Sequence, residues 1–494
     1  MKVKNILVML LIFLVGCSSL EERERDNFTQ ECYIQEKVPR FQERERENIP
    51  YFSRVDDGSK KIKTLGCDEG RYLELFKDRK IKGIGDSSPY WRWEVEFSKK
   101  NLETILNENI YNLKKSNRTA VYFVKNGKWD SGNIGKNPVG KLEKITVLKR
   151  GLSGVARELL VKGSRGTYLI TKEYNIRKVL AFNKFEGKKG DIYLKGKDGK
   201  NIGKNMSMLP SGFFAPEIKG NVVKIYGGGF GHGVGMPQWG ARDLAEKRKF
   251  EYDDILERYY PETSLSRASR VIKNADSLLV LIGQGGTFEQ QNIKLISPVD
   301  MSIRVEGKNH KIKKDTQVEF NIRNGILDIK SSGKVLAKTK EQIIITSKGK
   351  IGVRSNLKKH LKKGYPEYYG DFIIRPYGTG RMLLINRVNL EDYLKGVLPS
   401  EMPQSFGLEA LKAQAVSSRT YAVSAVLGNK YSKYGVNLVD SVSSQVYNNS
   451  NESEIANRAI RETAGRILTY NNRPINTYFY SSSWGVSAVP EEIW

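Results

Sequence analysis

A long helical pattern that follows many short strand patterns is the feature that most restricts the fold. Apolar residues recur on one face across residues 408–423, after a turn at 403–407, and predict a helix that ends near Gly428. Residues 276–390 instead favour strands. Runs of strand-like composition lie at 302–305, 317–320 and 372–374. The chain is therefore predicted to be α+β, with mixed helices and antiparallel β-rich lobes flanking a cleft.

The first half of the chain mixes both kinds of element. Residues 91–97 alternate apolar and polar side chains with the period of a strand, and Ser98 can cap a helix that runs through Leu106. Further short strands are predicted at 156–161 and 167–171, with glycine turns between them.

Residues 221–265 predict a strand, a glycine-rich loop at 227–236 and a helix, for which Pro237 suits the first turn. A short helix is expected at 252–260. Near the end of the chain, a helix is predicted at 455–464 and a strand at 475–480.

Residues 1–20 carry the features of an export signal. Lys2 and Lys4 precede an apolar run at 6–15 that is short for a membrane span. The run ends in Leu-Val-Gly-Cys, which resembles the bacterial lipobox and implies that Cys17 becomes the lipidated first residue of the mature protein. The alternative is an uncleaved anchor helix, and both readings export the bulk of the chain to the cell wall or periplasm.

The charged residues 21–49 are interpreted as a tether that holds a catalytic body away from the membrane. Export leaves Cys32 and Cys67, which either pair in an oxidising compartment or stay free. Three cysteines in 494 residues exclude a disulfide scaffold.

The net charge of +28, from 83 Lys and Arg against 55 Asp and Glu, favours polyanionic partners. Anionic cell wall and lipid headgroups fit this charge, and so does a lysine-rich composition without a specific partner. No nucleic-acid-binding motif is found, so nucleic acid is not expected to be a partner.

Glu401 is the carboxylate that most resembles a catalytic group. Pro399 and Pro403 flank it, and predict a stiff turn just before the long helix. Apolar neighbours at 398, 402 and 406 can desolvate a carboxyl group and raise its pKa, as a general acid needs, whereas a helix N-terminus favours the anion. The alternative is a carboxylate that only caps the helix.

The long helix carries polar residues that suit sugar binding or ordinary solvation equally. Lys412 and Arg419 are seven residues apart and so fall near one face.

In the glycine-rich loop, His232 is either a substrate contact or a buried, hydrogen-bonded histidine. The loop lacks the Gly-Lys-Ser/Thr ending of a phosphate loop, and no zinc-ligand spacing is present.

Long motifs resemble the SpoIID/LytB family, known from stage II sporulation. They are LEDYLKGVLPSEMP at 390–403, LEALKAQAV at 408–416, SRTYA at 418–422, SQVY at 444–447, YSSS at 480–483 and GFGHGVGMPQWGA at 229–241. The last of these resembles the closing motif of the family, yet it comes first here.

Read as 276–494 followed by 50–265, the chain gives one complete family domain. Residues 50–265 would be its C-terminal half, residues 266–275 a connector, and residues 276–494 its N-terminal half. That half would consist of a β-rich lobe at 276–390 and a catalytic helical segment at 391–494. A circular permutation, a head-to-tail dimer and a wrongly joined gene model each explain the order.

The resemblance implies a peptidoglycan lytic transglycosylase. Such an enzyme cleaves the bond between N-acetylmuramic acid (MurNAc) and N-acetylglucosamine (GlcNAc) of glycan strands and leaves a 1,6-anhydro-MurNAc end. Glu401 would act as acid and then as base. The residues expected to bind the glycan are Lys412, Arg419, Tyr421, Gln445, Tyr447, Ser481, Ser482, Ser483, His232 and Gln238.

Some members of the family carry a zinc-binding His/Cys cluster before the Gln-Val-Tyr motif. Residues 440–444 contain neither residue type, so no zinc and no other cofactor is expected. One rival function is non-catalytic activation of a cell-wall amidase, a role attached to the LytB side of the family. Another is a wall-binding lipoprotein that uses its positive charge.

Overall fold

The computed structural model describes residues 32–33, 49–58, 68–183, 190–272, 277–357, 361–441, 443–447 and 452–494. The predicted signal at 1–20, the lipid acceptor Cys17 and nearly all of the tether at 21–49 lie outside this part of the chain. Cys67 also lies outside it. Within the described residues, no helix is both long and apolar enough to cross a bilayer.

The chain forms two compact units. Unit 1 combines Met1–Gly240 with Tyr480–Trp494, and unit 2 is Ala241–Phe479. The unit boundary at Gly240–Ala241 does not coincide with the predicted connector at 266–275, because α7 (Tyr252–Tyr259) packs with the helices of unit 2. Residues 264–267, at the start of the predicted connector, form a strand of a unit 2 sheet. Whether 50–265 and 276–494 are two halves of one family domain stays a prediction.

Unit 1 contains two antiparallel sheets. The first has the order β1-β5-β6-β7-β3-β4, with β1 (Cys32–Tyr33), β5 (Leu142–Arg150), β6 (Ala156–Gly163), β7 (Gly166–Thr171), β3 (Val121–Lys125) and β4 (Lys128–Asp130). The second has the order β10-β11-β2-β8-β9, with β10 (Phe214–Lys219), β11 (Val222–Gly227), β2 (Trp93–Ser98), β8 (Tyr193–Lys195) and β9 (Asn201–Lys204). The strands predicted at 91–97, 156–161 and 167–171 are therefore confirmed.

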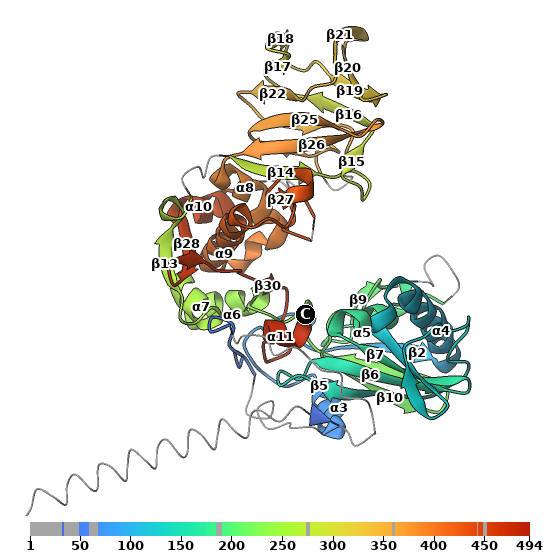
Figure 1. The fold of residues 1–494 in the computed structure, drawn as a ribbon. Coiled ribbons are helices and arrows are strands. Elements are labelled where there is room, and N and C mark those ends of the chain that lie inside the picture. The colour runs from blue at the N-terminus through green and yellow to red at the C-terminus, as the bar shows by residue number, and fades with distance from the viewer. Residues whose placement is uncertain are drawn as a thin grey trace, which may run out of the picture. The chain divides into compact units, whose positions relative to one another are not determined.

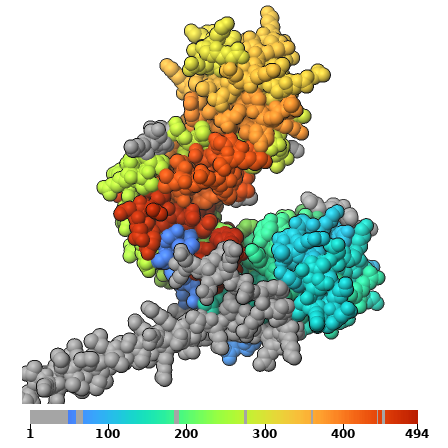
Figure 2. Space-filling view, in the orientation of Figure 1, coloured from blue at the N-terminus to red at the C-terminus, as the bar shows by residue number. Residues whose placement is uncertain are grey.

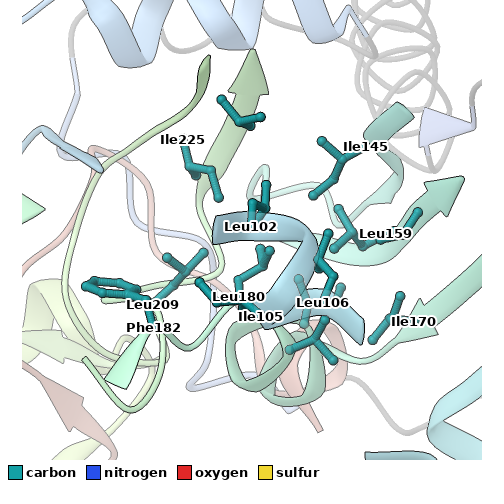
Figure 3. Close-up of a cluster of buried hydrophobic side chains, with 14 of the residues drawn as sticks. Leu102, Ile105, Leu106, Ile145, Leu159, Ile170, Leu180, Phe182, Leu209 and Ile225 are labelled. Atoms are coloured by element: carbon teal, nitrogen blue, oxygen red, sulfur yellow. The ribbon is translucent and has the colours of Figure 1, made fainter. Parts of the chain in front are cut away.

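Helix α4 (Lys99–Ser116) supplies much of the core of unit 1. Ser98 caps it as predicted, because its hydroxyl accepts a hydrogen bond from the N–H of Asn101 at 3.2 Å. Side chains three or four residues apart then share one buried face, on which Leu102, Ile105 and Leu106 lie (Figure 3). Each such leucine or isoleucine stabilises the fold by about 1.5–3 kcal/mol through burial. Two shorter helices, α3 (Glu69–Lys77) and α5 (Glu173–Val179), belong to the same unit.

The far end of the chain completes unit 1. The indole ring of Trp484 is buried, and its centroid lies 5.3 Å from that of Phe76 and 5.6 Å from that of Phe213. The backbone carbonyl of Trp484 accepts a hydrogen bond of 2.8 Å from the buried guanidinium of Arg92. Residues separated by nearly the whole sequence thus share one core.

The β-rich part of unit 2 is built from two sheets. The larger has the order β18-β17-β22-β25-β26-β14-β27, with β15 also paired to β26. Its strands are β18 (Lys308–Ile312), β17 (Met301–Val305), β22 (Ile343–Ser347), β25 (Asp371–Tyr377), β26 (Arg381–Val388), β14 (Leu278–Ile282), β27 (Leu438–Val439) and β15 (Glu289–Gln290). The other has the order β21-β20-β19-β16-β23-β24, with β21 (Lys334–Thr339), β20 (Ile326–Ser331), β19 (Val318–Arg323), β16 (Asn292–Ile296), β23 (Ile351–Val353) and β24 (Glu367–Tyr368). Pairing is antiparallel except between β14 and β27, which are parallel.

The helical part of unit 2 contains α8 (Leu390–Glu401), α9 (Leu408–Leu427) and α10 (Glu454–Glu462). Figures 1 and 2 place it at one end of the unit, with the hairpins of β17–β18 and β20–β21 at the other end. Helix α9 has the predicted bounds, and its side chains are buried almost all round between residues 410 and 423. The α+β class is confirmed.

The segment after α10 differs from the prediction. Strands β28 (Arg466–Tyr470) and β29 (Arg473–Pro474) pair with each other, and β28 also pairs with β13 (Ser264–Arg267). Of the strand predicted at 475–480, only β30 (Phe479–Tyr480) is regular. The preceding backbone instead follows α9, where the hydroxyl of Thr477 donates to the carbonyl of Ser417 at 2.6 Å.

Candidate functional site

Glu401 is the last residue of helix α8, and not part of a free turn between two prolines as predicted. Pro399 is accommodated in the last turn of this helix, although it has no N–H to donate there. Pro403 disfavours helical geometry at the residue before it, and Met402 is accordingly extended, with φ −131° and ψ 131°. The second proline therefore ends the helix at Glu401 and fixes where the carboxylate leaves the backbone.

The carboxyl group of Glu401 accepts a hydrogen bond from the backbone N–H of Val446 to Oε1 at 2.6 Å. Burial raises the pKa of Glu401 from its ordinary 4.5 to about 7, and the bond from Val446 lowers it by less. The predicted apolar neighbours Leu398, Met402 and Phe406 are all buried. Desolvation therefore outweighs the effects that favour the anion, and the C-terminal end of the α8 dipole acts in the same direction.

The peptide that holds Glu401 is itself held from both sides. The hydroxyl of Tyr393 in α8 donates to Oε1 of Gln445 at 3.1 Å, and the hydroxyl of Tyr447 donates to Oδ1 of Asn386 at 2.9 Å. Both tyrosines and Gln445 are buried. Because Val446 lies between the two anchored residues, its N–H has a fixed direction toward Glu401. Tyr393 is thus a positioning residue, which the sequence patterns did not reveal.

Two donors of the predicted set are Gln445, which precedes Val446 in the chain, and Tyr421, whose hydroxyl is affected electrostatically by Glu401. The side-chain nitrogen Nε2 of Gln445 is buried and has no hydrogen-bond partner among the described residues. Burial raises the pKa of Tyr421 to about 12, with smaller contributions from Tyr431, Tyr478 and Glu401, so its hydroxyl keeps its proton at neutral pH. An unused amide and a neutral hydroxyl can donate to sugar oxygens.

Lys412 and Arg419 were both predicted to contact glycan, and in the structure both form ion pairs with glutamates. Arg419 is fully buried and makes two hydrogen bonds to Glu391, of 2.9 and 2.7 Å, which join α9 to the first turn of α8. Lys412 pairs with Glu409 at 2.8 Å and with Glu462 at 2.6 Å. These cations hold the three helices together, and Glu391 is a structural residue that the sequence analysis missed.

The other predicted site residues belong to unit 1. His232 lies in the glycine-rich loop and is half-buried, and its Nδ1 accepts a hydrogen bond of 3.1 Å from the N–H of Val234. This bond leaves the proton of a neutral imidazole on Nε2. The ring centroid of His232 lies 5.7 Å from that of Tyr480 and 5.5 Å from that of Trp494.

The predicted serines pair with the same loop. Phe230 and Ser482 exchange two backbone hydrogen bonds, of 2.8 and 3.1 Å, and the carbonyl of Ser481 accepts one of 3.0 Å from Trp239. Ser482 and Ser483 are buried, and so is Gln238 at the start of α6 (Gln238–Arg248). The structure therefore unites two motifs that are far apart in the sequence. That they act together with Glu401 of unit 2 stays a prediction.

Among the described residues, no group of three or more His, Cys, Asp or Glu side chains is placed to hold a metal ion. The segment in which zinc ligands would occur has the sequence Asp-Ser-Val-Ser-Ser, of which Val442 lies outside the described residues. The expectation that the site uses no cofactor stays a prediction.

Residues 378–470 match the model of the SpoIID family, described as stage II sporulation protein. This segment belongs to the SpoIID/LytB family. The match includes Glu401, Tyr393 and Gln445, whereas His232 and Ser482 lie outside it.

Three curated proteins match part of this chain. The amidase enhancer of Bacillus subtilis is 39% identical over 101 residues, which are 20% of this chain and 13% of that protein. Stage II sporulation protein D of Bacillus amyloliquefaciens is 36% identical over 125 residues, which are 22% of this chain and 36% of that protein. An uncharacterized protein of Brachyspira hyodysenteriae is 38% identical over 128 residues, which are 26% of this chain and 34% of that protein. The chain thus spans about a third or less of the length of the curated relatives that it matches.

Removal of the Tyr393 hydroxyl tests whether the bond from Tyr393 to Gln445 positions the Val446 N–H against the Glu401 carboxyl group. In Tyr393→Phe, Gln445 loses its anchor and the Val446 N–H bond weakens. Because that bond lowers the pKa of Glu401, we expect the pKa to rise above about 7. The measurement is a pH titration of the Glu401 carboxyl band by infrared difference spectroscopy. Tyr168→Phe, which removes a buried hydroxyl bonded to the Pro138 carbonyl in unit 1, is the control. An unchanged pKa in Tyr393→Phe would contradict the positioning role.

A second prediction concerns stability. The pKa of Glu401 is about 7 in the folded protein, against an ordinary value of 4.5. Its contribution to the free energy of unfolding is therefore fully present below pH 4.5 and is lost as the pH rises through 7. Gln at this position stays neutral, and its oxygen can still accept from Val446. We expect Glu401→Gln to be more stable than the natural protein by about 1–3 kcal/mol at about pH 8, with little difference at about pH 4. Urea unfolding at both pH values measures this, and equal stability at about pH 8 would count against a raised pKa.

Proposed function

We propose that this protein is a peptidoglycan lytic transglycosylase that cleaves the MurNAc–GlcNAc bond of glycan strands, with Glu401 as its acid and base. The observation that carries the proposal is the carboxyl group of Glu401, which lies in a SpoIID segment and has a pKa of about 7. A carboxylic acid that is half protonated near neutral pH can both donate and accept a proton during one cycle.

The proposed reaction needs only one carboxyl group. Protonated Glu401 donates its proton to the bridging oxygen as the bond from that oxygen to C1 of MurNAc breaks. The resulting carboxylate then accepts the proton of the C6 hydroxyl of the same sugar, and that oxygen bonds to C1. The products are a free GlcNAc hydroxyl end and a 1,6-anhydro-MurNAc end. Water is not a reactant, so the reaction does not need the second carboxylate that activates water in inverting glycosidases.

The environment of Glu401 supports both halves of this cycle. Burial favours the neutral acid that starts the reaction, while the Val446 N–H at 2.6 Å stabilises the carboxylate that is left after donation. Nε2 of Gln445 and the hydroxyl of Tyr421 would bind the glycan. Because the acid form starts the cycle, the rate should fall about tenfold per pH unit well above pH 7.

Cleavage is tested with the natural protein, Glu401→Gln and the control Glu454→Gln, which changes an exposed carboxylate on α10. Each is incubated with purified glycan strands, and anhydro-muropeptides are measured by mass spectrometry. We expect Glu401→Gln to lose at least about 10²-fold in rate and the control to keep full activity. Equal product from Glu401→Gln and the natural protein would refute the role of Glu401.

A second candidate function is non-catalytic activation of a cell-wall amidase. It is supported by the similarity of this chain to the amidase enhancer of B. subtilis. This function predicts no anhydro product from the protein alone and faster peptide release when an amidase is added. It also predicts that Glu401→Gln stimulates the amidase as well as the natural protein does.

We also propose that the protein is exported and anchored by lipid at Cys17, facing the wall or periplasm. The support is the charged start, apolar run and Leu-Val-Gly-Cys ending of residues 1–17. Metabolic labelling with a fatty acid should modify the natural protein and leave Cys17→Ala unlabelled. Equal labelling of both proteins would place the lipid elsewhere, and no labelling of either would exclude the anchor.

A further inference from the structure

A groove of about 800 Å³ runs along the solvent side of helix α4 in unit 1. Its walls are α4, the loop at 136–141 and the turn at 164–165 between β6 and β7. This volume is within the range of small-ligand sites. All of its residues lie outside the SpoIID segment and outside the motifs at 229–241 and 480–483.

The groove is preformed by hydrogen bonds that need no ligand. Asn107 clamps the loop, because its Oδ1 accepts from the N–H groups of Val139 at 2.8 Å and Gly140 at 3.0 Å while its Nδ2 donates to the Gly140 carbonyl at 3.0 Å. Oε1 of Glu103 accepts from the N–H of Leu142 at 2.8 Å. Gly140 has a φ of +69°, and a Cβ there would lie 2.5 Å from the hydroxyl of Ser164. The loop therefore packs against the turn too closely for another residue type.

Cations without a counter-ion line one wall of this groove. Lys136 and Lys141 lie on the loop and Arg165 on the turn, and none of the three takes part in an ion pair within the described residues. On the opposite wall, α4 presents Lys100 together with the carboxylates of Glu103 and Glu108.

This mixture of charges restricts the ligand. Phosphates that lie close to Glu103 and Glu108 would be repelled, whereas hydroxyl groups of a ligand can donate to these two carboxylates. The lining side chains are of polar or charged types, apart from the aromatic ring of Tyr111, and their aliphatic parts add apolar surface to the groove.

We propose that this groove binds an acidic saccharide. Its carboxylate would pair with Lys136, Lys141 and Arg165, its hydroxyls would donate to the α4 carboxylates, and the apolar face of a sugar ring would lie on Tyr111. The groove is a second glycan site, and the proposal does not require Glu401 to cleave anything.

The test uses the full chain carrying Glu401→Gln, so that glycan is not consumed. Three probes are compared: a peptide-free oligomer of alternating GlcNAc and MurNAc, a neutral GlcNAc oligomer of the same length, and a short acidic peptide. Hydrogen exchange with mass spectrometry reports protection of peptides within 100–112 and 136–141, and calorimetry reports affinity and stoichiometry. The variant is Lys136→Ala with Lys141→Ala, and the matched control is Lys125→Ala with Lys128→Ala, two exposed lysines of the β3–β4 hairpin.

We expect the acidic oligomer to protect both regions and the neutral oligomer to bind at least about tenfold more weakly. The groove variant should lose this protection, and the control variant should keep it. Absence of protection, equal protection in the groove variant, or equal binding of the acidic peptide would overturn the proposal. If the natural protein cleaves no glycan while protection of the groove persists, the proposed enzymatic function fails and the groove site stands.

Discussion

The hydrogen bond from the N–H of Val446 to the buried carboxyl group of Glu401 is the interaction on which the proposed chemistry depends. Burial alone would favour a permanently neutral acid, and several N–H donors would favour a permanent anion. Burial dominates and the bond from Val446 acts against it, which leaves the pKa at about 7, between these limits. Both protonation states are therefore accessible near neutral pH.

The geometry of that bond rests on a buried framework. Arg419 joins α8 to α9 through Glu391, and Glu391 also accepts a hydrogen bond of 3.1 Å from the N–H of Gly465 after α10. Arg419 is fully buried, whereas the side chain of Glu391 is 31% exposed, so removing Glu391 would leave a buried cation without its ion-pair partner and destabilise the fold. The cation that the sequence suggested as a glycan ligand thus acts on the site indirectly, by fixing the helix that ends in Glu401.

Local signals in the sequence predicted the elements whose causes are local. The turn at 403–407 and Gly428 gave the bounds of α9, and Ser98 gave the start of α4. Helix α8 was missed because Pro399 argues against a helix, although its last turn tolerates the proline. The roles of Tyr393 and Arg419 could not be predicted, because their partners Gln445 and Glu391 lie 52 and 28 residues away and meet them only after folding. The apolar neighbours of Glu401 indicated that burial could raise its pKa, but the sequence left the direction of the net shift open, and the Val446 N–H that lowers the pKa was not foreseen.

The most direct test is the pKa of Glu401 in the natural protein. Glutamate labelled with ¹³C at the side-chain carboxyl gives one signal for each residue, and the signal that disappears in Glu401→Gln belongs to Glu401. Its titration by NMR should have a midpoint at about 7. A midpoint at 4.5 or below would mean that the carboxyl is an ordinary ionised group, and the proposed acid and base would be contradicted.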